Sequence, residues 1–270
     1  MMGLRVGIAS DAGRKCLKRR TVPPWAIASI QFADQPHRVE LPFVRSAHAD
    51  LFEALEKPER WEDRAHLFHD ALAQRFRFAG SAPENRAARK NSYLRFLRGW
   101  AVDSSSVEGA VLKGWVESRF GLVPTYHKLR IGALGDEAYQ SYTDEWTRGS
   151  AHTSDVFTQL DLLYEFTQDE LERRHPDEAG VLLYRGVDEN AEHAVIAQEG
   201  KRRFVVRLNN LCSFTLEREL AWEFGSTVWE ARVPFARIFF FSGLFPTSLL
   251  RGESEHLVIG GELRVVRVMD

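Results

Sequence analysis

Apolar residues recur at intervals of three or four positions through much of the first half of the chain. Three segments follow this pattern most clearly, namely residues 61–76, 93–100 and 156–171. In the last of them Leu160, Leu163 and Leu171 fall on one side of a helix that ends before Pro176. The spacing predicts amphipathic helices whose apolar faces contribute to a core.

Two acidic residues lie on this last helix. Asp161 and Glu165 are one helical turn apart, so they could act together in acid–base chemistry. On an otherwise amphipathic helix, however, such residues usually belong to the face that meets water. We therefore expect both carboxylates to be solvated.

From about residue 180 the chain changes to short segments rich in valine, leucine, phenylalanine and tyrosine, with turn residues between them. Such segments are typical of strands. They are VLLYRGV, RFVVRL, LCSFT, STVWEARV, RIFFFSG, HLVI and ELRVVRV. Between the last two lies Gly260-Gly261, a pair suited to a two-residue hairpin turn, so we expect the chain to reverse there.

The order of these patterns predicts an α+β protein in which a helical N-terminal layer packs on a sheet. The segment PDEAG is the expected boundary between a mainly helical region, residues 1–176, and a β-rich region, residues 177–270. A chain of 270 residues can bury one large core, and nothing in the sequence requires the two regions to fold separately. We expect one integrated domain.

The composition is that of an ordinary soluble globular protein, with 44% apolar residues, 27% charged residues and a formal net charge of -2. No strong positive field favours nucleic acid as a partner, and no run of about eighteen apolar residues could span a membrane. Cys16 and Cys212 are far apart and indicate neither a disulfide framework nor a zinc ribbon. We expect a cytoplasmic protein.

His66 and His69 come nearest to a metal-binding pattern. They are three apart on a predicted helix and could bind one metal ion together. No cysteine, and no third histidine placed by any metal motif, joins them. Surface histidines are the simpler interpretation, so we predict no metal site.

The strand VLLYRGV contains an arginine among apolar residues. A buried guanidinium needs an anionic partner, and the planar fork of Arg185 suits a phosphate or a carboxylate. Gly186, the next residue, would leave room for a ligand to approach the backbone. Taken alone, Arg185 is more simply an edge-strand residue that faces water.

Two further strands carry polar side chains that share a face. Ser213 and Thr215 are two apart, with Phe214 on the other face, and their hydroxyls could position a carboxylate. Glu253 and Glu255 also share a face just before an apolar run, where a charged start of a strand is the simpler interpretation. Each motif is commonplace when taken separately.

Taken together and in this order, the arginine, the Ser-x-Thr and the Glu-x-Glu resemble the Arg-Ser-Glu class of ADP-ribosyltransferases. Longer stretches are similar to one family of that class, the dinitrogenase reductase ADP-ribosyltransferases of nitrogen-fixing bacteria. These stretches are residues 109–127, 159–166, 183–187, 208–215 and 252–261. The resemblance covers the chain from about residue 90 onward.

This resemblance implies a fold, a reaction and partners. The fold would be a helical layer on an ADP-ribosyltransferase-like split antiparallel β-sandwich. NAD would be a substrate that supplies ADP-ribose to one arginine of dinitrogenase reductase, the iron protein of nitrogenase. This modification would switch nitrogenase off reversibly when ammonium rises or energy falls. A PII signal protein is implied as an activator, and ADP as a candidate effector.

The resemblance also implies roles for the carboxylates. Glu255 would lie beside the ribose of NAD, where its charge stabilises the positive charge that develops as nicotinamide leaves. Ser213 would hold Glu255 in that place. Glu253 would face the target arginine, orient its guanidinium and accept its proton as the new bond forms.

The remaining site residues would bind NAD. Arg185 would hold the pyrophosphate, and the backbone of Gly186 would contact the nicotinamide amide. Tyr184, Phe214 and Thr215 would lie beside them. Many members of the wider class carry Ser-Thr-Ser where this chain has Ser-Phe-Thr. Threonine keeps the second hydroxyl, so we expect the site to be catalytically active.

Other functions are compatible with the same residues. The chain could be an arginine-specific transferase with another protein target, or an NAD glycohydrolase. It could also be a non-catalytic NAD-binding regulator built on this fold. The joint presence of Arg185, Ser213 and Glu255 argues against the last alternative, because a non-catalytic protein has no chemical need for all three.

Overall fold

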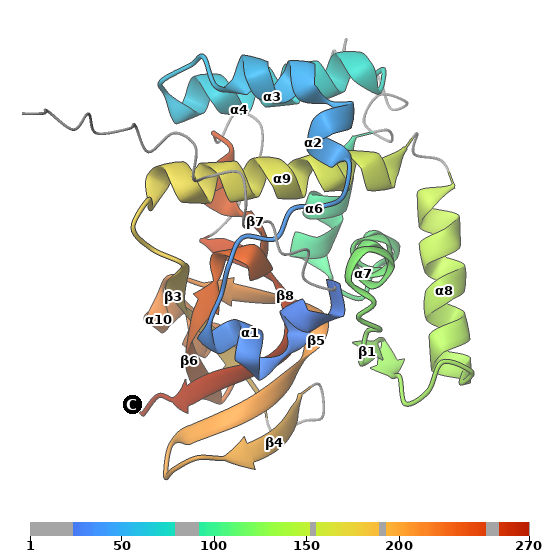
Figure 1. Cartoon of the computed structure of the whole chain (residues 1–270). Helices are drawn as coiled ribbons and strands as arrows, with labels where there is room; N and C mark the ends of the chain where they lie inside the picture. The colour runs from blue at the N-terminus through green and yellow to red at the C-terminus, as the bar shows by residue number, and fades with distance from the viewer. Residues whose placement is uncertain (1–23, 79–91, 152–154, 189–192, 247–253, 270) are drawn as a thin grey trace, which may run out of the picture.

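The computed structural model of the chain describes residues 24–78, 92–151, 155–188, 193–246 and 254–269 (Figure 1). Cys16 and Glu253 lie outside these ranges. Helices occupy most of the described chain up to Arg174, and strands dominate from Gly180 onward. The predicted α+β fold class is therefore confirmed.

The three helices with the clearest sequence pattern are all present. They are α4 (Trp61–Arg75), α6 (Tyr93–Val102) and α9 (Val156–Arg174). The other α-helices are α1 (Ile30–Asp34), α2 (Val44–Ala47), α3 (Ala49–Leu55), α7 (Val107–Phe120), α8 (Glu137–Ser150) and α10 (Arg218–Ala221). Short 3-10 turns are η2 (Pro24–Ala28), η3 (Trp222–Phe224), η4 (Phe235–Arg237) and η5 (Ser242–Leu244).

The strands of the main sheet are β3 (Gly180–Val187), β4 (Ala194–Gln198), β5 (Arg203–Thr215), β6 (Thr227–Pro234), β7 (Ile238–Phe241) and β8 (Glu255–Arg267). All of their pairings are antiparallel, in the order β4-β5-β3-β6-β8-β7. β5 also pairs with β8, so β5, β3, β6 and β8 form a closed ring. A separate small hairpin joins β1 (Tyr126–His127) to β2 (Leu129–Arg130).

Helix α9 lies at the centre of the core that the helices and the sheet share. In Figure 1 it lies between α3 and α4 on one side and the sheet on the other, while α8 stands at the outer edge beside α7. Phe166 of α9 stacks on Phe68 of α4, with ring centroids 4.3 Å apart. The rings of Trp115 on α7 and Phe239 on β7 are in contact, with centroids 4.7 Å apart. One core of buried apolar residues therefore joins the helical layer to the sheet.

The predicted hairpin turn at Gly260-Gly261 is wrong. Both glycines lie inside one long strand, β8, which pairs along most of its length with β5. The register of the pair shifts between Leu208 and Leu211 of β5. A Cβ atom at Gly260 would lie only 1.7 Å from the carbonyl oxygen of Asn209. The close approach of two backbones, and not a turn, requires glycine here.

The prediction that Asp161 is solvated is also wrong. Its side chain is almost fully buried, since α9 is covered on more than one side. Asp161 accepts hydrogen bonds from the indole nitrogen of Trp115 at 2.8 Å and from two nitrogens of Arg119 at 2.6 and 2.8 Å. The carboxylate therefore anchors α7 to α9.

Glu165 departs from the prediction in the same way, because it is fully buried. Its Oε1 accepts a hydrogen bond from the backbone nitrogen of Leu41 at 2.6 Å, and its Oε2 lies 3.7 Å from both Arg38 and Arg45. Burial raises the pKa of Glu165 to about 7, and these partners oppose the rise. Glu165 thus fixes the segment before α2 onto α9.

Candidate functional site

Three strands bring Arg185, Ser213 and Glu255 together. Arg185 of β3 donates from Nη1 to the carbonyl oxygen of Ser213 at 2.7 Å. The hydroxyl of Ser213 on β5 donates to Oε1 of Glu255 on β8 at 2.6 Å. The strand register explains the meeting, because Thr215 faces both Tyr184 and Glu255 across its two neighbouring strands. The three residues that the sequence pattern grouped are thus in direct contact.

Arg185 has a second partner that the sequence did not predict. Its Nε donates to Nε2 of His193 at 3.2 Å. Burial, and then the nearby guanidinium, lower the pKa of His193 to about 3. A neutral histidine can accept this hydrogen bond, so His193 helps to hold the guanidinium without adding charge.

The indole of Trp100 contacts the same cluster from the helical layer. Its Nε1 donates to the hydroxyl oxygen of Ser213 at 2.9 Å, across 113 positions of sequence. Trp100 lies on α6 and is 3% exposed. Its position in an apolar helical stripe indicated a core residue, and the hydrogen bond is an additional role.

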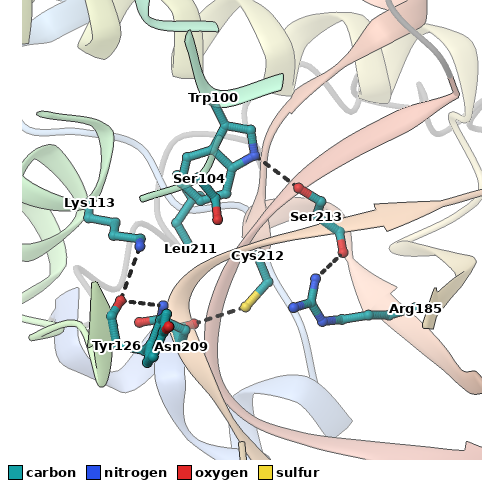
Figure 2. A pocket seen from close by; sticks show the side chains of 9 residues that line it. All are labelled: Trp100, Ser104, Lys113, Tyr126, Arg185, Asn209, Leu211, Cys212 and Ser213. Atoms are coloured by element: carbon teal, nitrogen blue, oxygen red, sulfur yellow. Dashed lines mark hydrogen bonds between the residues drawn. The ribbon is translucent and has the colours of Figure 1, made fainter. Parts of the chain in front are cut away.

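A small, polar cavity opens beside this cluster, between the helical layer and the sheet (Figure 2). Lys113 of α7 lines it opposite Arg185, as Figure 2 shows. The ammonium of Lys113 donates to the carbonyl oxygen of Tyr126 at 3.0 Å and lies 5.7 Å from the ring centroid of Trp100. The other lining residues are Ser104, Asn209, Leu211, Cys212 and Ser213.

The irregular part of β5 builds one wall of the cavity. Asn209 donates from Nδ2 to the carbonyl oxygen of Tyr126 at 2.9 Å. Asn210 donates from Nδ2 to the carbonyl oxygens of Lys113 and Leu122, each at 2.9 Å. These bonds fasten β5 to helix α7 and to the chain that follows it, which explains two adjacent asparagines in a mostly apolar strand.

The arrangement has a definite chemical character. Guanidinium and ammonium groups on opposite sides of the cavity favour a ligand that carries negative charge. A carboxylate held by a serine hydroxyl, next to them, can bind a hydroxyl group or stabilise a positive charge that develops in a reaction. The site therefore suits a substrate with an anionic part and a centre that becomes cationic.

Comparison with known proteins identifies the family. The family model described as dinitrogenase reductase ADP-ribosyltransferase (DRAT) matches residues 17–267. The chain belongs to this family. It is 40% identical to the NAD(+)--dinitrogen-reductase ADP-D-ribosyltransferase of Rhodospirillum rubrum over 255 residues, which cover 90% of this chain and 91% of that protein. No solved structure gives a significant match. The resemblance seen in the sequence is confirmed.

Gly186 packs closely against the backbone of another part of the chain. A Cβ atom at Gly186 would lie 2.0 Å from the carbonyl oxygen of Ala221 and 2.9 Å from the nitrogen of Gly225. The space beside Gly186 is therefore filled by the protein's own backbone around α10 and η3. Its glycine is explained by this packing, and contact of its backbone with a ligand stays a prediction.

The other residues predicted to bind a ligand do not line the cavity beside Ser213. Burial raises the pKa of Tyr184, and the charge of Glu230 and a hydrogen bond with it raise this pKa further. Phe214 is buried in the core. Thr215 is buried too, and its hydroxyl oxygen accepts from the backbone nitrogen of Glu217 at 3.1 Å. Their predicted roles are not tested by these contacts.

The two helical histidines differ from each other. His66 is exposed, as predicted, but His69 is partly buried, with its Nδ1 3.2 Å from the hydroxyl of Tyr93. Within the described ranges, no three His, Cys, Asp or Glu side chains gather closely enough to hold a metal ion.

The helices in the same ranges are all too short or too polar to cross a membrane. A cytoplasmic location stays a prediction.

Proposed function

We propose that this chain is an NAD-dependent mono-ADP-ribosyltransferase that modifies an arginine of dinitrogenase reductase. The observation that carries the proposal is the contact of Arg185, Ser213 and Glu255 beside a cationic cavity, in a chain of this family. The name of the relative from Rhodospirillum rubrum, which includes both NAD and the target, supports the same reaction.

The donor set suits NAD as the substrate. Arg185 and Lys113 line the cavity with two cationic groups, which suit a pyrophosphate. Glu255 offers a carboxylate to the ribose, oriented by Ser213. Asn209 and Ser104 add neutral donors and acceptors to the wall.

The reaction exchanges one glycosidic bond for another. The bond between the ribose and the nicotinamide nitrogen breaks, and a bond forms between the same ribose carbon and a guanidinium nitrogen of the target. One proton leaves the guanidinium. Glu255 stabilises the positive charge on the ribose, and Glu253, which lies outside the described residues, orients the incoming arginine and accepts the proton.

Regulation is part of the proposal and rests on the resemblance to the family. A PII signal protein would activate the enzyme, with ADP as an effector, when ammonium rises or energy falls. The modified dinitrogenase reductase would then be inactive, and nitrogenase would stop until ADP-ribose is removed. The protein would act in the cytoplasm, where its substrate is made.

The deciding experiment incubates the full chain with NAD labelled in its ADP-ribose part and with purified dinitrogenase reductase. Transfer of label to that protein, lost when its acceptor arginine is changed to lysine, is the expected result. A reaction with and without a PII protein and ADP tests the regulation. Label on other proteins alone indicates a different target, and free ADP-ribose alone indicates an NAD glycohydrolase. No nicotinamide release with any acceptor indicates a non-catalytic regulator.

A further inference from the structure

The helical layer donates a hydrogen bond to Ser213, the residue whose hydroxyl donates to the carboxylate of Glu255. The indole nitrogen of Trp100 donates to the hydroxyl oxygen of Ser213 at 2.9 Å, and the same hydroxyl donates to Glu255 at 2.6 Å. We propose that Trp100 is a positioning residue for Glu255, which acts by fixing the direction of the Ser213 hydroxyl. The inference rests on the proposed function, because it concerns the same carboxylate.

The direction of this relay follows from the chemistry of the indole. An indole nitrogen can donate a hydrogen bond but cannot accept one, whereas a serine hydroxyl has one hydrogen and two lone pairs. The bond from Trp100 therefore uses a lone pair of Ser213 and leaves its single hydrogen for another acceptor. Glu255 Oε1 is that acceptor. Without the indole donor, the hydroxyl could rotate and donate elsewhere.

Trp100 is held firmly enough to impose this direction. It is 3% exposed on α6. That helix begins at a Ser92 cap, and the backbone nitrogen of Tyr93 donates to Gln159 of α9 at 2.9 Å. The ammonium of Lys113 lies 5.7 Å from the centroid of the indole ring, a favourable cation–π distance. The donor is thus packed within the helical layer.

This relay makes the site incomplete without the helices. Arg185, Ser213 and Glu255 all lie on strands, but the group that orients Ser213 lies on α6. Hydrogen bonds in such a chain polarise one another, so the indole also strengthens the bond to the carboxylate. Because the carboxylate acts on charge that appears in the transition state, loss of the donor should affect the chemical step more than substrate binding.

The first test is Trp100→Phe, which removes the donor and keeps an aromatic ring. The turnover number for nicotinamide release should fall about tenfold, as when a group that orients a catalytic ligand is lost, while KM for NAD stays within about twofold. A higher KM with an unchanged turnover number would identify Trp100 as a substrate contact and overturn the proposal.

The second test is a double-mutant cycle with Ser213→Ala. If Trp100 acts only through the Ser213 hydroxyl, Trp100→Phe should cause no further loss of turnover in the Ser213→Ala protein. An equal tenfold loss in both backgrounds would show an action independent of that hydroxyl, and the proposal would fall.

Trp115→Phe is the matched control. Trp115 is also a buried tryptophan whose indole donates to a side-chain oxygen, Asp161 Oδ1 at 2.8 Å, but it lies outside the cavity lining. The free energy of unfolding of Trp115→Phe should be lower than that of the unaltered chain. Its turnover number, calculated for the folded protein, should be unchanged.

If Trp100→Phe does not fold, a 3-benzothienylalanine at position 100 keeps the shape of tryptophan and lacks only the N–H donor. The same tenfold loss is expected, and full turnover would refute the relay. The variant Glu255→Gln separates this inference from the proposed function. If the unaltered chain releases no nicotinamide, the proposed function fails. Activity that survives Glu255→Gln contradicts the role of Glu255, whereas loss with Glu255→Gln and none with either change at Trp100 contradicts the relay alone.

Discussion

The hydroxyl oxygen of Ser213 lies 2.6 Å from Oε1 of Glu255, although 42 positions separate the two residues in the sequence. The antiparallel pairing of β5 and β8 brings them together, because Ser213 faces Leu257 and Thr215 faces Glu255 across that pair. The distance is typical of a hydroxyl that donates to a carboxylate. The serine hydroxyl thus orients the carboxylate of Glu255.

Glu255→Gln should almost abolish nicotinamide release and ADP-ribose transfer. A unit charge about 4 Å from a developing cation, at an effective dielectric constant of about 20, contributes about 4 kcal/mol, which is on the order of a thousandfold in rate. Glutamine keeps the size of the side chain and loses its charge. Steady-state rates with labelled NAD measure the loss, and urea unfolding checks that the variant is folded. If the variant kept half the normal rate, Glu255 would not be the group that stabilises the developing charge.

Arg185→Lys should weaken NAD binding about tenfold, since hydrogen bonds to charged groups contribute roughly 1.5–3 kcal/mol and lysine lacks the planar fork. The guanidinium also holds the Ser213 carbonyl and His193, which an ammonium cannot do in the same geometry. Equilibrium binding of NAD is the measurement. Arg207→Lys is the control, because Arg207 makes an exposed pair with Glu262 at 3.2 Å and does not line this cavity. Equal affinities for both variants would contradict the prediction.

Glu253→Gln should separate the transfer of ADP-ribose to arginine from the hydrolysis of NAD. Transfer to a protein arginine requires a group that orients the guanidinium and takes its proton, whereas hydrolysis of NAD uses water as the acceptor. The variant should lose transfer and keep measurable NAD hydrolysis. Parallel assays of labelled protein and released nicotinamide check this. A proportional loss of both activities would show that the two glutamates do not divide the work as proposed.

The sequence grouped three residues of the candidate site by a family motif, and it missed Trp100 and His193, which meet them through tertiary contacts. Arg185, Ser213 and Glu255 are recognisable because each interrupts a strand with a polar group. Trp100 belongs to an apolar helical stripe, which is the pattern of a core residue, and its partner is 113 positions away. His193 has no motif, and only the folded sheet brings it to Arg185.

The same limit explains the errors in the fold. Helix spacing predicted α9 correctly but could not show that other elements cover the face that carries Asp161. Its partners Trp115 and Arg119 come from α7, more than forty positions earlier. The glycines of β8 read locally as a turn, and only tertiary contacts show why they are small. An added Cβ would meet Asn209 on the neighbouring strand at Gly260 and Ala28 of η2 at Gly261. Local patterns fix local structure, and long-range packing decides these cases.

Gly260→Ala should destabilise the protein by several kcal/mol, on the order of 3, because the new methyl group has no space against a backbone carbonyl. The Cβ atom would lie 1.7 Å from the oxygen of Asn209, and a shift of either strand would disturb the cavity wall. Urea unfolding followed by tryptophan fluorescence measures the change. Gly135→Ala is the matched control, because no atom lies within 4 Å of its added Cβ. Similar stabilities of the two variants would contradict the tight approach of β5 and β8.

His256 should lower the stability of the protein as the pH falls from about 6.5 to about 4. Burial lowers the pKa of His256 to about 4, below the value of about 6.5 for an unperturbed histidine. Between these values the unfolded chain binds a proton that the folded chain does not bind. The free energy of unfolding therefore decreases as the pH falls, by at most about 1.4 kcal/mol per pH unit for this group.

His256→Phe isolates this contribution. The substitution removes the titrating group and can keep the stacked contact with Phe241, whose ring centroid is 5.8 Å away. Glu165 acts in the opposite direction, since its raised pKa of about 7 adds stability as the pH falls toward about 4.5. Both the variant and the unaltered chain contain Glu165, so its contribution cancels when their pH dependences are compared. Unfolding free energies at about pH 7.5 and about pH 5 should therefore differ less in His256→Phe than in the unaltered chain, and an equal difference would show that His256 is protonated in the folded state as readily as in the unfolded one.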